Sequence, residues 1–130
     1  SHLFLSMHES PAPCELVLDT DTFNEIDDQF ALAHLLLSPE RVRIEAVHAA
    51  PFSNARAATP EVGMEKSYDE ILRVLDLVGP AVRPPVYRGS TSYLPGARSP
   101  VDSAAARDLV ERALAPRSGR LNVLSIGACT

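Results

Sequence analysis

Four aspartates lie within ten residues near the start of this 130-residue chain: Asp19, Asp21, Asp27 and Asp28. They follow one apolar run and begin a second, which is the pattern of a strand that leads into a helix. Carboxylates repel one another, so a cluster of four at such a junction needs a hard cation, shared protons or a bound polyol to offset the repulsion. The spacing therefore predicts a binding or catalytic site.

A purely structural role for the four aspartates is the competing interpretation. Asp27 and Asp28 in the first turn of a helix would complement the helix dipole, which stabilises by about 0.3–1 kcal/mol for each acid. Asp19 and Asp21 would then be ordinary turn residues. Because four acids at one junction lose more through mutual repulsion than the dipole returns, we favour a functional site.

Two other metal-site patterns also begin with Asp-x-Asp. An EF-hand loop needs Gly at its sixth position and Glu at its twelfth, where this chain has Asn24 and Phe30, so that reading is excluded. A phosphohydrolase of the haloacid-dehalogenase type would use Asp19 as its nucleophile. That pattern has Thr or Val two residues after the second Asp, where this chain has Phe23, and it does not call for a second acidic pair. The phosphohydrolase remains an alternative.

The elements that must position these residues alternate between strands and helices. Apolar runs and turn signals predict strands at 15–19, 42–48, 85–87 and 121–126, with helices at 26–37, 60–78 and 99–115. This order is typical of an α/β fold with an open, mainly parallel, Rossmann-like sheet and flanking helices. The chain stops at a strand exit, which predicts a domain truncated after its fourth strand. Residues 1–13 are predicted to be a flexible leader, and 14–130 to be the N-terminal part of a single domain.

Local signals predict how the helices start and pack. Thr59 before a proline is expected to cap the second helix, and Ser99 in a capping box is expected to begin the third. The helix at 26–37 is apolar nearly all round, with Phe30, Ala33 and Leu37 on one face, so we expect it to be largely buried. His34 within it is then expected to be a buried histidine with its hydrogen bonds satisfied.

Charge and cysteine content narrow the partners and the compartment. A formal net charge of −5 argues against non-specific binding to nucleic acid or to anionic membranes, which both require a basic surface. The sequence contains no apolar run near the ~20 residues of a membrane span. Of the two cysteines, Cys14 is expected to be a buried, reduced thiol, which suits a cytoplasmic protein.

Several motifs, in order, resemble the N-terminal half of nucleoside hydrolases, the inosine/uridine-preferring N-ribohydrolase family. They are Val17-Leu18-Asp19-Thr20-Asp21, the Asp27-Asp28 pair, the strand leading to Asn54, Pro85-Val86-Tyr87-Arg88-Gly89, and Gly127-Ala128-Cys129-Thr130. Two departures indicate a divergent subfamily. The family places its acidic pair four residues after the second Asp, where this chain has a spacing of six, and the family's His-Gly-x-Asp-Gly segment has no match.

The resemblance implies a calcium-dependent enzyme that hydrolyses the N-glycosidic bond of nucleosides to ribose and free base. The resemblance assigns calcium binding to Asp21, Asp28 and the backbone carbonyl of Thr130, with Asp19 as a secondary ligand. Asp21 is also the general base that takes a proton from water. Asp27 and Asn54 are the residues expected to bind the ribose. Calcium suits this chemistry because a hard ion with many oxygen ligands can hold water and a diol together.

The resemblance also implies a small-molecule nucleoside or related riboside as partner, and a homo-oligomer. Since the family completes its site with residues farther along the chain, we expect these 130 residues alone to be inactive. A third alternative is a homologue that binds ribosides or calcium without catalysis. The base preference is not readable from the sequence.

Overall fold

The structure is a computed structural model that describes residues 11–130. Along the chain its elements are β1 (Cys14–Thr20), α1 (Ile26–Leu36), β2 (Val42–Ala49), α2 (Pro60–Val78), β3 (Val86–Arg88), α3 (Ala104–Leu114) and β4 (Asn122–Ser125). Each predicted strand and helix is therefore present. Most of the predicted leader lies outside the described residues.

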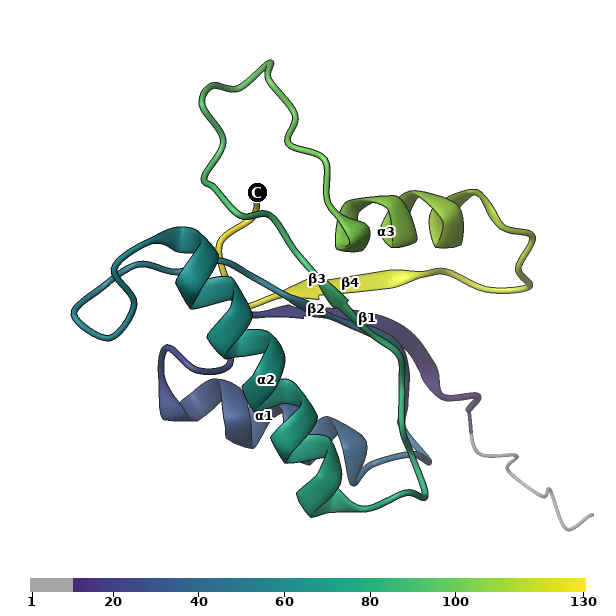
Figure 1. The fold of residues 1–130 in the computed structure, drawn as a ribbon. Helices are drawn as coiled ribbons and strands as arrows, with labels where there is room; N and C mark the ends of the chain where they lie inside the picture. The colour runs from purple at the N-terminus through teal and green to yellow at the C-terminus, as the bar shows by residue number, and fades with distance from the viewer. Residues whose placement is uncertain (1–10) are drawn as a thin grey trace, which may run out of the picture.

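The four strands form one parallel sheet in the order β3-β2-β1-β4. Helices α1 and α2 cover one face of the sheet, and α3 lies on the other (Figure 1). This arrangement confirms the predicted α/β, Rossmann-like fold. Because all strands run the same way, their carboxyl ends meet at one edge of the sheet, where ligands bind in open folds of this kind.

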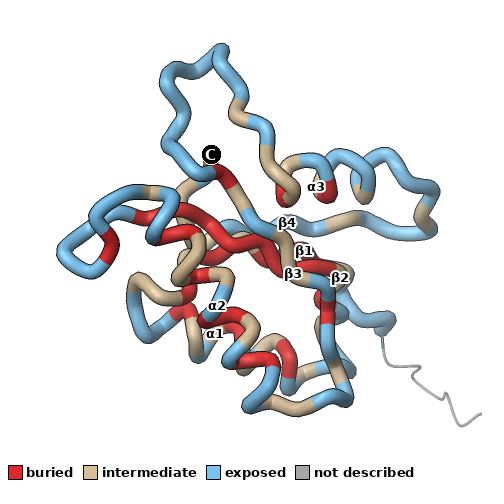
Figure 2. The backbone as a smooth tube through the Cα atoms, in the orientation of Figure 1, coloured by how far each residue is buried: buried red, intermediate tan, exposed pale blue. Residues whose placement is uncertain are grey.

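The core lies between the sheet and the pair of helices α1 and α2. Leu18 of β1, Leu32 of α1 and Ile71 of α2 are fully buried and belong to one apolar cluster. Figure 2 shows the buried residues concentrated in β1, β2 and the inner sides of these helices, whereas β4 is exposed and α3 has only two buried residues, Ala105 and Asp108. The strand ends near α1 and α2 are thus held by a dry core, while the α3 side is more open.

Capping residues set the ends of α2 and α3. Oγ1 of Thr59 accepts a hydrogen bond from the Val62 amide at 3.2 Å, which confirms the predicted N-cap of α2. For α3 the prediction of Ser99 was wrong, because Ser103 is the N-cap and accepts from the Ala106 amide at 3.0 Å. Three alanines follow Ser103 directly, and alanine is the strongest helix former, so the helix begins there.

The prediction that α1 is buried on most sides was wrong. Phe30 is 69% exposed, and His34 is exposed as well, so it is not a buried histidine. The buried side of α1 is the row Asp28, Leu32 and Leu36, spaced by four residues. Ala33 and Leu35 are partly buried beside this row, and the rest of the helix surface stays more exposed, because a helix that packs on one layer buries a single stripe of its surface.

The cysteine prediction also needs correction. Cys14 is an exposed free thiol, since it is the first residue of β1 and lies before the part of the strand that the helices cover. Cys129 is exposed and free too. Among residues 11–130, no helix combines the length and apolar character needed to cross a membrane.

Candidate functional site

The predicted acidic cluster lies at the carboxyl end of β1. Asp21 is the first residue after the strand, and Asp27 and Asp28 are in the first turn of α1. The connecting loop closes on itself: the Asn24 amide donates to the Asp21 carbonyl at 2.7 Å, and Nδ2 of Asn24 donates to Oδ2 of Asp21 at 3.0 Å. The extra residues of this loop therefore form a turn that holds the Asp21 carboxylate.

Asp28 is the buried member of the cluster. Its Oδ2 accepts a hydrogen bond of 2.7 Å from Oγ1 of Thr20, which lies 2.9 Å from Oγ1 of Thr22. Burial raises the pKa of Asp28 to about 6; the Thr20 hydrogen bond opposes the rise, and the nearby Asp21 carboxyl adds to it. Asp28 is thus a carboxylate whose charge lacks full compensation from protein groups.

Among the predicted calcium ligands, Asp21 contributes to the raised pKa of the buried Asp28. Asp27 is exposed and contributes to that pKa only through its charge. Within residues 11–130, no three His, Cys, Asp or Glu side chains gather closely enough to hold a metal ion. Asp21 and Asp28 offer two hard oxygen donors, which suit calcium in kind but supply only part of its usual six to eight ligands.

Asn54 reaches the cluster through a residue that the sequence did not single out. Nδ2 of Asn54 donates to Oδ1 of Asn24 at 2.7 Å, and Asn24 in turn binds Asp21. Arg56 also donates to the Asn24 backbone carbonyl. Asn24 lies in the loop that is longer than in the family, and this extra length was the one feature of the sequence that pointed to it. The structure therefore joins Asn54 to Asp21 by one chain of side-chain hydrogen bonds.

Asp19 lies on the opposite face of the sheet from Asp28. Successive side chains of a strand point to opposite faces, so Asp19 leaves β1 on the α3 side while Thr20 leaves it toward α1. Ser125 of β4 donates to Oδ2 of Asp19 at 2.8 Å. Burial raises the pKa of Asp19, although the Ser125 hydrogen bond and the nearby His48 work against the rise.

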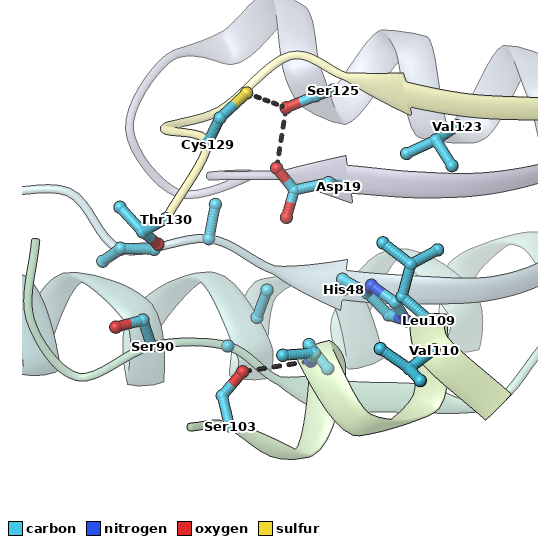
Figure 3. A pocket seen from close by; sticks show the side chains of 16 residues that line it. Asp19, His48, Ser90, Ser103, Leu109, Val110, Val123, Ser125, Cys129 and Thr130 are labelled. Carbon is cyan, nitrogen blue, oxygen red and sulfur yellow. Dashed lines mark hydrogen bonds between the residues drawn. The ribbon is translucent and has the colours of Figure 1, made fainter. Parts of the chain in front are cut away.

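A pocket of about 340 Å³ lies on this α3 side of the strand ends (Figure 3). Asp19 and Thr130 line it, so these two predicted ligands share one cavity. Asp21, Asp28 and Asn54 do not line it. The acidic cluster thus has two parts: Asp21 with Asp28 beside α1, and Asp19 with Thr130 beside the pocket.

The structure adds a buried charged network that the sequence did not predict. Nε2 of His48 lies 2.7 Å from Oδ2 of Asp108, and both side chains are almost fully buried. Nε of Arg112 donates to both oxygens of Asp108 at 3.0 and 2.9 Å. Burial alone would raise the pKa of Asp108, but the hydrogen bonds from Arg112 and His48 hold it below its usual value. Sixty residues separate His48 from Asp108, and no local motif joins them.

Taken together, the strand ends carry a carboxylate pair able to accept a proton or a cation, amide groups able to bind hydroxyls, and an adjoining pocket. Such groups can bind a cation or a polar ligand beside a mainly apolar pocket. Comparison of the chain with protein-family models, with curated proteins and with solved structures gave no match.

Proposed function

We propose that this protein is a calcium-dependent nucleoside N-ribohydrolase, acting in the cytoplasm as a homo-oligomer. The observation that carries the proposal is the placement of Asp21 beside the buried Asp28 at the carboxyl end of β1. The charge of Asp28 is poorly compensated, and a hard cation would relieve the repulsion between the two carboxylates. The motifs that resemble nucleoside hydrolases supply the choice of reaction.

Hydrolysis of an N-glycosidic bond passes through a ribosyl oxocarbenium ion that water attacks. Asp21 would accept a proton from that water as its oxygen bonds to C1′, while the C1′–N bond breaks and its electron pair leaves with the base. The Asn24 hydrogen bond orients the Asp21 carboxylate for this step. Asp27, which is exposed, and Asn54, which is tied to Asn24, would bind the ribose hydroxyls.

Calcium held by Asp21, Asp28 and the Thr130 carbonyl would supply a Lewis-acidic contact for the water and the ribose diol. The oxygen donors match this ion in kind; Thr130 lines the pocket, whereas Asp21 and Asp28 do not, so the three donors would have to be brought together around the ion. Asp19 accepts a hydrogen bond from Ser125 and would position the end of β1 beside the calcium ion.

The test is reducing-sugar release from a panel of nucleosides by the full-length protein, in calcium and in excess EGTA. We expect release in calcium and its loss on chelation. Isothermal titration of the metal-free protein with calcium is the companion measurement. Calcium binding without ribose release would favour the non-catalytic homologue, and neither binding nor release from folded protein would refute the proposal.

One observation favours a second candidate, a phosphohydrolase. Asp19 lines the pocket and Asp21 does not, which is the placement expected if Asp19 were the nucleophile. This alternative predicts magnesium-dependent hydrolysis of p-nitrophenyl phosphate, abolished in Asp19→Asn. Under the ribohydrolase proposal neither magnesium nor a phosphate ester supports turnover.

A further inference from the structure

A row of polar side chains crosses the whole sheet on its α3 side. Strand register places Ser125 of β4 opposite Asp19 of β1, Asp19 opposite His48 of β2, and His48 opposite Tyr87 of β3. The contacts follow this row: Ser125 donates to Asp19 at 2.8 Å, and the His48 ring meets the edge of Tyr87 with centroids 5.8 Å apart. The sheet therefore presents four groups capable of hydrogen bonding along a single line beneath α3.

The network behind His48 fixes which of its ring nitrogens carries a proton. Asp108 is held ionised by two hydrogen bonds from Arg112, so its oxygens can only accept. Nε2 of His48 must therefore be the donor in the 2.7 Å contact. In the neutral ring Nδ1 is then an acceptor, and it has no hydrogen-bond partner among residues 11–130.

The pocket in front of this row is mainly apolar. Ala49 and Gly89 line it together with Leu109 and Val110 of α3. Figure 3 shows His48 and Asp19 on neighbouring strands beside this cavity, with the α3 side chains close to the His48 ring. A mainly apolar pocket with a few placed polar groups is the usual form of a small-molecule site, and such a pocket can receive a flat heterocycle.

Because Asp27 and Asn54, which would bind the ribose, follow β1 and β2 at the same edge of the sheet as this pocket, we propose that the pocket receives the leaving base of the nucleoside and that Nδ1 of His48 accepts a hydrogen bond from a base N–H. Asp108 and Arg112 are positioning residues that hold the ring and its tautomer. This inference rests on the proposed ribohydrolase function. It states which part of the substrate, the base, binds in the pocket beside α3.

The test compares two ribosides with the full-length protein. Inosine carries a base N–H, whereas 4-nitrophenyl riboside has a flat leaving group without one. We expect His48→Phe to lower kcat/KM for inosine by about 10- to 100-fold, the usual loss when a buried hydrogen bond is removed, and to change kcat/KM for the nitrophenyl riboside by less than about threefold. His48→Gln, which keeps an acceptor, should recover part of the inosine activity.

The ratio of the two activities is the decisive readout. Partial unfolding of a variant lowers both activities equally and leaves the ratio unchanged, so a merely structural role for His48 does not move it. An unchanged ratio in His48→Phe, or a wild type that cleaves the nitrophenyl riboside and no nucleoside, would overturn the inference while leaving the hydrolase reaction intact.

If the wild type cleaves neither riboside, the proposed function fails, and equilibrium binding then decides the inference separately. Titration with free hypoxanthine should show saturable binding that is at least about tenfold weaker in His48→Phe. Absence of binding, or equal binding by both proteins, would overturn it.

Discussion

Thr20 and Asp28 are joined by a buried hydrogen bond of 2.7 Å, which Oγ1 of Thr20 donates to Oδ2 of Asp28. The bond ties the last residue of β1 to the first turn of α1 across the loop between them. The lengthened loop therefore does not carry the acidic pair away from the strand end. Its extra residues are taken up in the turn that Asn24 closes on Asp21.

Asp28 should make the metal-free protein less stable as the pH rises. Its pKa is raised to about 6 from an ordinary 3.8, so the native state holds the Asp28 proton more tightly than the unfolded chain does. This stabilisation is fully present below about pH 4 and is lost as the pH rises through about 6. In EDTA, the stability of Asp28→Asn should not fall in this way as the pH rises from about 4 to 7, as measured by urea unfolding midpoints. Parallel profiles for wild type and Asp28→Asn would contradict the prediction, and Asp69→Asn on the exposed side of α2 is the control.

Asp21→Asn should abolish most of the ribose release. The amide cannot take a proton from water, and general-base catalysis typically contributes on the order of 100-fold or more to kcat. The measurement is reducing-sugar release by the full-length protein at saturating nucleoside and calcium. Asp69→Asn makes the same change of charge at an exposed position of α2 and should leave kcat unaltered. A kcat for Asp21→Asn within threefold of wild type would remove Asp21 from the mechanism.

Asp108→Ala should destabilise the protein strongly. It leaves His48 without its partner and Arg112 without its principal one, and breaking a buried charged pair costs roughly 3 kcal/mol in the free energy of unfolding. Asp102→Ala removes an acid of the same type from an exposed pair with Arg107, where the loss should stay below about 1 kcal/mol. Urea denaturation of both variants tests the contrast, and equal losses would show that the Asp108 network is not structural.

Gly63→Ala should also destabilise, because α2 crosses the segment after β2 at this point. A Cβ atom on Gly63 would lie 1.8 Å from the backbone oxygen of Phe52, so the helix or the segment would have to move. The expected loss is about 3 kcal/mol, the upper part of the range for overpacking. Gly96→Ala meets nothing within 4 Å and should change stability by less than about 0.5 kcal/mol. A thermal melt that ranks the two variants in the reverse order would contradict this packing.

The order of strands and helices was readable from the sequence because local signals set it. The apolar run ending at Asp19 and the cap at Thr59 each act within a few residues, and the structure has the corresponding elements there. The placement of Asp21, Asp27 and Asp28 at the carboxyl end of β1 followed from the same local signals and is observed. Position in the chain was thus sufficient to locate the acidic cluster.

Tertiary structure decided on which face of the sheet each acidic side chain lies and which residues it contacts. Burial of the Asp28 row of α1, rather than the face with Phe30, depends on how the helix lies against β1 and α2, which no local pattern encodes. The pairing of His48 with Asp108 likewise exists only because β2 and α3 meet in space. The sequence by itself determined the elements and the location of the acids, since these depend on neighbouring residues. The division into a carboxylate pair and an adjoining pocket arose only when distant elements packed together.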